Sequence, residues 1–249
     1  HNASLIHDDI VDQAEKRRGL KSANRIWGDH ATVLVGDFLL ARSLFLINKC
    51  KSSEVMGSVT NAASELANGQ ILDIMISKRL VTFNQDIYFK MIKLKTASLI
   101  SSSAEVGALL STTDIIKVRK LKLYGTNLGI SYQLIDDALD LLGDSSKMGK
   151  HTMEDIKEGK VTLPMLIALD KANYKDKKAI LKILQKKNFD RKNLDILYNF
   201  VLENNAVEET LQSASNYSSK AILAIESLNE SKYKDSLIAL AKENIVRVS

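Results

Sequence analysis

The sequence is poor in the residues that break helices or cross-link loops. Its 249 residues include one proline, 11 glycines and one cysteine. So few turn-forming residues argue against a loop-rich β fold and favour long helices. Cys50 has no partner for an internal disulfide, so a reducing, cytoplasmic compartment fits. We expect this thiol to be buried as a small hydrophobe.

Long apolar runs and a strong charge of one sign are also missing. No uninterrupted apolar stretch reaches about 18 residues, so no transmembrane helix is expected, and no signal peptide is visible. The formal net charge is +5, and part of the excess lies in residues 170–193. Acidic and apolar residues alternate with the lysines there, and aromatic residues make up 6% of the chain. We interpret this segment as a solvated helix face and expect no nucleic-acid partner.

Apolar residues recur at helical spacing almost throughout, which predicts one all-α domain over residues 1–249. The expected helices cover residues 1–15, 30–49, 53–76, 85–110 and 114–143, with a loop at 16–23 and a polar segment at 144–162. The helix over 30–49 is apolar enough to be buried, and Pro164 suits the first turn of a later helix. Because the chain opens on His1 within a helical pattern, we expect its N-terminal helices to be missing.

Two copies of the pattern D-D-x-x-D stand in apolar helical surroundings, a coincidence that is rare by chance. The copies are Asp8, Asp9 and Asp12, and Asp136, Asp137 and Asp140. Carboxylates four residues apart share a helix face and repel one another, so a cation should compensate them. Oxygen ligands suit Mg²⁺ or Mn²⁺ rather than zinc, and Mg²⁺ fills its remaining positions with water and phosphate oxygens. Two such acidic clusters, which we call the two acidic walls, predict a diphosphate held between them through metal ions. His7, beside the first cluster, is interpreted as a packed residue or a hydrogen-bond partner.

Cationic side chains accompany both acidic clusters. Arg17 and Arg18 follow the first, and the guanidinium fork suits phosphate oxygens. Lys95 stands with Thr96 on a mostly apolar helix face. Lys150 and Lys160 each follow a glycine in the polar segment after the second cluster, as in loops that close over phosphates. No GxxxxGK[ST] or GxGxxG pattern is present, so nucleotide-binding folds are not indicated.

By these motifs the chain resembles the trans-prenyltransferases, the all-α isoprenyl diphosphate synthases, and among them the bacterial long-chain octaprenyl type. The resemblance rests on the first aspartate motif with its RRG and on WGDHATVLVGDFLLARS, SELANGQ, KTA, YGTNLGISYQLIDDALDLLGD and GK…D…EGKVTLP. These motifs lie before residue 170, and residues 170–249 match only as helices. The resemblance implies a bundle of long antiparallel helices around a deep central cavity, usually a homodimer. The implied reaction adds isopentenyl diphosphate repeatedly to an allylic diphosphate such as farnesyl or geranylgeranyl diphosphate.

The resemblance also implies roles for the residues above. The metal ligands would be the six aspartates, with Asp8 and Asp12 on two Mg²⁺ ions, Asp136 on a third, and Asp137 and Asp140 holding its waters. The diphosphate would contact Arg17, Lys95, Lys150 and Lys160, and Arg18 would help to bind isopentenyl diphosphate. Thr96 and Gln133 would stabilise the carbocation or guide the departing proton. Further family ligands of isopentenyl diphosphate precede the first aspartate motif and are absent from this sequence.

Product length is expected to depend on Ala3 and Ser4, about one turn before Asp8. Both are small where short-chain members of the family carry aromatic rings, so we expect a long all-trans product, suited to a quinone side chain. Phe38, Phe45 and Met75 are candidates for a deeper stop, and product release allows peripheral contact with a membrane. The alternatives are a farnesyl or geranylgeranyl diphosphate synthase, a non-catalytic subunit of a heteromeric synthase, and a terpene cyclase.

Overall fold

The computed structural model describes residues 1–78, 84–143, 153–186 and 189–246. The prediction of an all-α protein is confirmed, since the described elements are helices apart from one two-stranded hairpin. The chain divides into two compact units, residues 1–60 and residues 61–249. Each unit is described by itself below.

The first unit is built around the packing of α1 on α3. Its elements are α1 (Asn2–Val11), β1 (Lys16–Arg17), β2 (Leu20–Lys21), α2 (Ala23–Trp27), α3 (Asp29–Asn48) and the first turns of α4 (Ser53–Ser77). A Cβ atom at Gly36 would collide with the ring of His7. His7 Nε2 lies 3.2 Å from the carbonyl oxygen of Val33 and 3.3 Å from Asp37 Oδ1. His7 is therefore a packed, hydrogen-bonded residue, as the sequence indicated.

The expectation that α3 is buried is wrong. Thr32 and Gly36 are its buried residues, whereas the side chains of Leu34 and Phe38 are 68% and 67% exposed. The helix is apolar on every side, but α1 and α2 cover only part of its surface. It is also the one helix among the described residues that is long and apolar enough to cross a membrane by length and composition. No such helix was expected from the sequence, because only unbroken apolar runs were considered. Core helices of soluble proteins also meet this criterion of length and composition.

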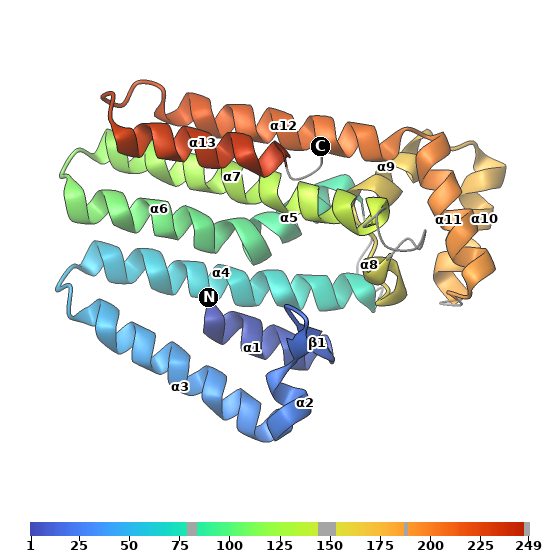
Figure 1. Cartoon of the computed structure of the whole chain (residues 1–249), viewed down its shortest axis with the longest axis horizontal. Helices are drawn as coiled ribbons and strands as arrows, with labels where there is room; N and C mark the ends of the chain where they lie inside the picture. The colour runs from blue at the N-terminus through green and yellow to red at the C-terminus, as the bar shows by residue number, and fades with distance from the viewer. Residues whose placement is uncertain (79–83, 144–152, 187–188, 247–249) are drawn as a thin grey trace. The chain divides into compact units, whose positions relative to one another are not determined.

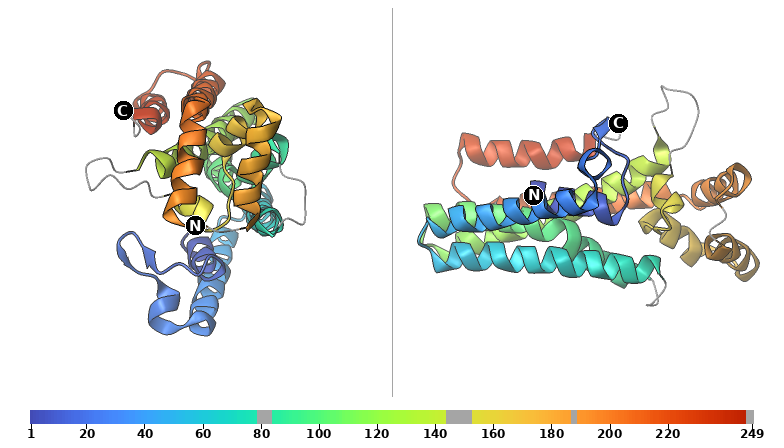
Figure 2. Two further views of the ribbon diagram at one scale, coloured as in Figure 1. Left: turned by 90° about the vertical axis from the view of Figure 1, so that its right-hand side faces the viewer. Right: turned by 90° about the horizontal axis from the view of Figure 1, so that it is seen from below.

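The second unit is a set of long helices (Figures 1 and 2). In it α7 (Ile115–Leu142) contacts both α6 (Ser98–Ser111) and α12 (Ala206–Ile225), and α12 contacts α13 (Lys232–Val246). Its elements are the rest of α4, α5 (Gln85–Ile92), η1 (Lys93–Ala97), α6 (Ser98–Ser111), α7 (Ile115–Leu142), α8 (Glu154–Lys157), α9 (Leu163–Lys171), α10 (Tyr174–Lys186), α11 (Arg191–Glu203), α12 (Ala206–Ile225) and α13 (Lys232–Val246). Glycines bring α7 close to its neighbours, because a Cβ at Gly125 would lie 2.7 Å from the Cα of Ser101.

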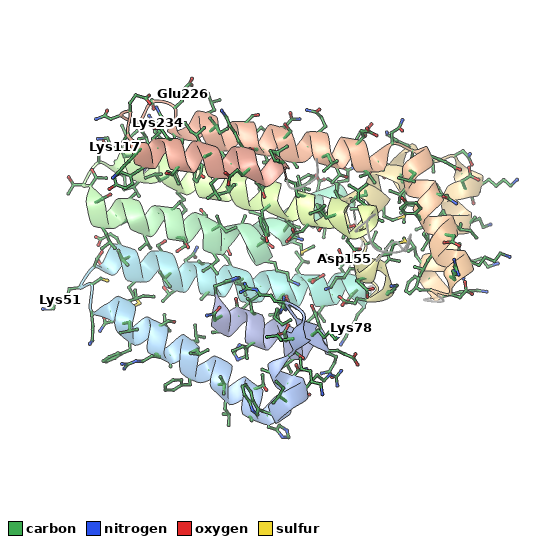
Figure 3. The ribbon with its side chains drawn as sticks, viewed as in Figure 1. Lys51, Lys78, Lys117, Asp155, Glu226 and Lys234 are labelled. Carbon is green, nitrogen blue, oxygen red and sulfur yellow. The ribbon has the colours of Figure 1, made fainter. Side chains whose placement is uncertain are left out.

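Local sequence signals explain where these helices begin. The side chains of Asn84, Asp114 and Asp190 accept hydrogen bonds from the first free backbone amides of α5, α7 and α11, which is how such residues stabilise helix starts. Pro164 lies in the first turn of α9, as predicted. The turn between α12 and α13 is closed by Lys234 (Figure 3), whose Nζ donates to the carbonyl oxygens of Glu226 (2.6 Å) and Leu228 (2.9 Å).

Two smaller expectations have different outcomes. Cys50 is exposed at the turn after α3, so its predicted burial is wrong: the thiol falls outside the helical repeat that would have directed it inward. In α10, Ile180 and Leu184 are buried while the lysines are mostly exposed, which confirms that this basic segment is a solvated helix face.

Candidate functional site

The first acidic cluster is organised by an ion pair between Asp9 and Arg17. Asp9 is 4% exposed, and its Oδ1 accepts hydrogen bonds from Arg17 Nε at 2.9 Å and from Arg17 Nη2. This hydrogen bond raises the pKa of Arg17 above its usual value, although burial opposes the shift. Arg17 Nη2 also lies 4.0 Å from Asp8 Oδ2. Asp9 therefore anchors the arginine, while Asp8 and Asp12 are only partly buried.

Arg17 and Arg18 lie in a tight hairpin, where the sequence predicted a loop. Arg17 pairs with Leu20 across the hairpin, and the two residues between them, Arg18 and Gly19, have φ angles of 53° and 80°. Positive φ at both central positions matches the turn type that suits the twist of a hairpin. The turn directs Arg17 back onto α1 and leaves Arg18 exposed at the tip.

In the second cluster both carboxylate oxygens of Asp137 are engaged by protein groups. Asp137 is 2% exposed; the Tyr88 hydroxyl donates to its Oδ2, and Gln133 Nε2 donates to its Oδ1 at 2.8 Å. Burial raises the pKa of Asp137 to about 6, against these two hydrogen bonds. Burial and the neighbouring carboxylate raise the pKa of Tyr88 well above its usual value, so this phenol keeps its proton and acts as the donor.

Asp140 links α7 to the short helix α8. Its Oδ1 accepts a hydrogen bond from the backbone N–H of Glu154 at 2.9 Å, and its Oδ2 accepts one from that of Asp155 at 3.2 Å. This places the Asp155 side chain, labelled in Figure 3, close to Asp137 and Asp140. Burial, followed by those two carboxylates, raises the pKa of Asp155 to about 7, while Lys160 lowers it.

The second aspartate of each motif is therefore an internal anchor rather than an open ligand. Asp9 is buried against Arg17, and Asp137 against Tyr88 and Gln133. The flanking Asp8, Asp12 and Asp136 are partly exposed, so these carboxylates suit a hard divalent cation. Among the described residues, no group of three or more acidic, histidine or cysteine side chains could hold an ion unaided. An ion here would need further ligands, as Mg²⁺ usually does with water and phosphate.

Lys95 and Thr96 lie in a π-helical turn, η1, at the end of α5. Such turns are rare and concentrate at functional sites. The turn packs against Gly69 of α4 so closely that a Cβ there would lie 2.7 Å from the Cα of Lys95. Lys95 Nζ donates to Asp73 Oδ2 at 2.7 Å, and the Thr96 hydroxyl donates to Gln133 Oε1 at 2.7 Å. The two predicted residues therefore each have a fixed polar partner.

One cavity of about 80 Å³ in the second unit collects five predicted site residues. They are Lys95, Thr96, Gln133, Asp137 and Lys160, and Asp73, Tyr88 and Asp155 also line it. A second, more apolar cavity of about 240 Å³ shares Ile76, Lys160 and Val161 with it. Lys160 Nζ donates to Glu158 Oε2 at 2.7 Å. The structure thus brings together two lysines, a threonine, a glutamine and several carboxylates around one small space.

Other predicted residues lie elsewhere. Lys150 and the adjoining segment 144–152 fall outside the described residues. Asp136 stands on α7 one residue before Asp137. Ala3 and Ser4 lie on α1 in the first unit, with Asp8, Asp9, Asp12, Arg17 and Arg18.

Four residues with polar roles in the second unit were missed from the sequence. They are Gln70, Asp73, Tyr88 and Asp155. Gln70 ends the SELANGQ motif and Asp73 follows it by three residues, so this motif could have identified both. Gln70 Nε2 is buried with no hydrogen-bond partner. Asp155 was the unassigned aspartate of the last motif. Tyr88 had no signal, because its partner Asp137 is distant in the sequence.

The raised pKa of Asp155 makes a testable prediction about metal-free protein. A carboxyl whose folded pKa is near 7 and whose unfolded pKa is near 4 binds a proton preferentially in the folded state between these values. Its stabilising effect is complete at low pH and disappears as the pH rises through 7. Relative to Asp155→Asn, the free energy of unfolding of the wild type should fall by about 2 kcal/mol between pH 4.5 and 7.5. A fully buried carboxyl would give a larger change, but Asp155 is partly exposed to solvent.

Urea unfolding of both proteins at a series of pH values, in the presence of a chelator, measures this difference. Parallel pH profiles for the two proteins would show that Asp155 does not retain a proton in the folded state.

Comparison with known proteins adds sequence relatives across the whole chain. A family model described as polyprenyl synthetase matches residues 1–201. A prenyl transferase of Cyanidium caldarium is 36% identical over 99% of this chain and 75% of its own length. The octaprenyl diphosphate synthase of Haemophilus influenzae is 33% identical over 99% of this chain and 74% of its own length. The chain thus spans about three quarters of these relatives.

Solved structures agree with this. A decaprenyl diphosphate synthase from Rhodobacter capsulatus superposes with a TM-score of 0.93 at 34% identity, covering 100% of this chain and 76% of that one. A polyprenyl synthase from Caulobacter crescentus CB15, solved with calcium and isoprenyl diphosphate, gives a TM-score of 0.91 at 33% identity, with the same coverage of both chains.

Proposed function

The chain belongs to the polyprenyl synthetase family, and we propose that it adds isopentenyl diphosphate repeatedly to an allylic diphosphate to give a long-chain all-trans polyprenyl diphosphate. It is an enzyme of the prenyltransferase class. The observation that carries the proposal is the cavity of the second unit, in which Lys95, Thr96 and Gln133 lie beside Asp137 and Asp155. Cations for a leaving diphosphate and neutral oxygens for a carbocation are what this reaction needs in one place.

The acidic residues fit a divalent cation, because their ligand atoms are oxygens. The buried amide Gln70 Nε2 has no protein acceptor, and as a donor it suits a water or phosphate oxygen rather than the ion itself. We propose that Asp8, Asp12 and Asp136 hold three Mg²⁺ ions together with the substrate diphosphate. Bound in this way, the ions would neutralise the charge that develops on the leaving diphosphate. Asp9 and Asp137 would act as anchors, and Asp140 would hold α8 and Asp155 in place through its two backbone hydrogen bonds.

The side chains then have separate tasks. Arg17, Lys95 and Lys160 would bind the allylic diphosphate, joined by Lys150, and Arg18 would contact isopentenyl diphosphate. When the allylic C–O bond breaks, diphosphate leaves with the electron pair. The Thr96 and Gln133 oxygens would face the allylic cation, and such preorganised dipoles are a large source of rate enhancement. The double bond of isopentenyl diphosphate attacks the cation, a C–C bond forms, and the released diphosphate accepts the departing proton.

Turnover of labelled isopentenyl diphosphate with farnesyl diphosphate and Mg²⁺, with the product length recorded, tests the function. A long polyprenyl product supports the proposal. A farnesyl or geranylgeranyl product would identify a short-chain synthase. No turnover by the chain extended to the full length of its relatives would favour a non-catalytic subunit, and a cyclic hydrocarbon would indicate a terpene cyclase.

Product length gives a second prediction. Ala3 and Ser4 lie about one helical turn before Asp8 on α1, and both are small. Replacing Ala3 with tyrosine should shorten the product to farnesyl or geranylgeranyl length, because the ring obstructs the path of the growing chain. The first condensation should keep its rate within a few-fold, since the ring is away from metal and phosphate. Chromatography of the products of wild type, Ala3→Tyr and the small-residue control Ala3→Ser measures this.

A wild-type product of farnesyl length, or an unchanged product from Ala3→Tyr, would contradict the assignment of these positions. An unchanged long product would leave Met75, partly buried on α4, as the candidate for the deeper stop, since Phe38 and Phe45 are 67% and 53% exposed on α3.

We also propose a homodimer in the cytoplasm, as the family resemblance implies, with peripheral membrane contact for release of an apolar product. A role of the product as a precursor of quinone side chains is supported by the length of the octaprenyl product named for the relative from Haemophilus influenzae. We further propose that the two units act as one synthase domain.

A further inference from the structure

Tyr88 is a buried phenol beside the proposed catalytic residues without being one of them. It lies on α5, its side chain is fully buried, and its hydroxyl donates to Asp137 Oδ2. Its ring meets that of Phe89 edge-to-face, with ring centroids 5.5 Å apart. A hydroxyl buried in such a core usually makes a specific hydrogen bond. A phenylalanine ring would pack as well there without the free-energy cost of burying an oxygen atom.

The hydrogen bonds that follow from Tyr88 have one consistent direction. Asp137 is an acceptor for Tyr88 on one oxygen and for Gln133 Nε2 on the other, at 2.8 Å. The amide of Gln133 is thereby oriented, because its NH₂ end faces a carboxylate and its carbonyl end must face the other way. That carbonyl oxygen accepts the hydroxyl proton of Thr96 at 2.7 Å. The order is Tyr88, Asp137, Gln133 and Thr96, and each side chain has one arrangement that satisfies its neighbours.

This order decides which atoms of Thr96 face the cavity that it lines. With its proton given to Gln133, the Thr96 oxygen has only lone pairs to offer in other directions. A lone pair stabilises a neighbouring carbocation, whereas a hydroxyl proton pointing at it would destabilise it. If the Gln133 amide turned over, its NH₂ end would donate to Thr96, whose proton would then have to point elsewhere, including into the cavity.

We propose that Tyr88 is a positioning residue for the prenyl transfer reaction: by holding Asp137 it fixes the Gln133 amide, and through it the direction of the Thr96 oxygen lone pairs. This inference rests on the proposed function of the chain. Without the phenol, Asp137 loses one of its two donors in a buried site. Its carboxylate can then rotate, and the orientation of Gln133 is no longer unique.

Tyr88→Phe tests this by removing one oxygen and keeping the ring. The kcat should fall about tenfold to thirtyfold, while KM for both substrates stays within about twofold, because no group that binds diphosphate is altered. Tenfold corresponds to about 1.4 kcal/mol. Tyr124→Phe is the control: Tyr124 is 2% exposed, and its hydroxyl donates to the carbonyl oxygen of Leu237 at 2.8 Å, away from the site. It should lose a similar amount of thermal stability and keep its kcat.

A structural role alone would not give a dependence on Thr96, so a double-mutant cycle with Thr96→Val separates the two explanations. The Tyr88→Phe effect on kcat should nearly vanish in the Thr96→Val background. Multiplicative effects, or an unchanged kcat in Tyr88→Phe, would overturn the inference. Calorimetric binding of inorganic pyrophosphate with Mg²⁺ should be the same in wild type and Tyr88→Phe, and a large loss of that affinity would assign Tyr88 to the metal site instead.

Asp137→Asn keeps the test decisive should Tyr88→Phe fail to fold. The side-chain amide of this variant cannot accept hydrogen bonds from both Tyr88 and Gln133, so kcat should fall. The Mg²⁺ concentration that gives the half-maximal rate should stay unchanged. A raised Mg²⁺ requirement would make Asp137 a metal ligand and overturn the order of hydrogen bonds described above. Loss of the proposed function itself is distinguishable, because the wild type would then show no prenyl transfer.

Discussion

Asp136→Ala is expected to lower kcat about a thousandfold, with Asp8→Ala giving a loss of the same order. Each replacement removes a partly exposed carboxylate that the proposal assigns to a metal ion, and loss of one preorganised charge-stabilising group at such a site costs roughly a hundredfold to a thousandfold. Excess Mg²⁺ should restore little activity, since a ligand is lost. Steady-state rates over a Mg²⁺ titration measure both effects.

The fold should survive these changes, because each removes a partly exposed carboxylate that repels its neighbours on the same helix face. Asp195→Ala on α11 is the control, since Asp195 is exposed and remote in sequence from both motifs; it should keep full activity. Near-normal turnover by Asp136→Ala or Asp8→Ala at saturating Mg²⁺ would refute the assignment of two acidic walls.

Gly69→Ala is expected to lower kcat at least a hundredfold and to destabilise the fold. The new methyl group would lie 2.7 Å from the Cα of Lys95 and 2.9 Å from the carbonyl carbon of Leu94. Both are backbone atoms of a packed helix, so the π-helical turn η1 must move by roughly an ångström, a displacement that can cost about a hundredfold in rate. Overpacking of this kind typically costs about 1–3 kcal/mol of stability.

Gly107→Ala on α6 is its control, because a Cβ at Gly107 meets no atom within 4 Å. That variant should gain a few tenths to about 1 kcal/mol from helix propensity and keep its rate. Urea unfolding and steady-state kinetics on both variants give the comparison. A Gly69→Ala protein with wild-type kcat would show that the close approach of α4 to η1 has no part in placing Lys95 and Thr96.

The sequence was sufficient for the helices and the acidic clusters, because both depend on short-range spacing. The 3.6-residue periodicity located α3, α4 and α7 to within a residue or two at each end. It failed where spacing does not decide the outcome. The apolar residues of α3 predicted burial, but burial depends on what covers a helix. The RRG segment forms a hairpin because Arg18 and Gly19 both take positive φ. Of these two residues, only the glycine can be expected from sequence to adopt that conformation.

Part of the candidate site could not have been predicted in this way. Lys95, Thr96 and Gln133 were chosen through family motifs, and the structure places all three around one cavity. The second aspartate of each D-D-x-x-D pattern is buried against a protein partner, Arg17 in one case and Tyr88 in the other. No spacing rule connects Tyr88 to Asp137, because the contact forms only when α5 packs near α7.

The π-helical turn also has a consequence for how the chain could change by insertion or deletion. Consecutive residues of an α-helix point about 100° apart, yet Lys95 and Thr96 are neighbours in sequence and both line the same cavity. The wider turn holds one residue more than an α-helical turn would, and α5 and α6 are therefore out of phase across it. Deleting one residue between positions 93 and 97 would bring the two helices into phase and turn every side chain on one side of the deletion by that angle. The family motif KTA is thus tied to a backbone irregularity, and a shorter helix with the same three letters would not present the same surface.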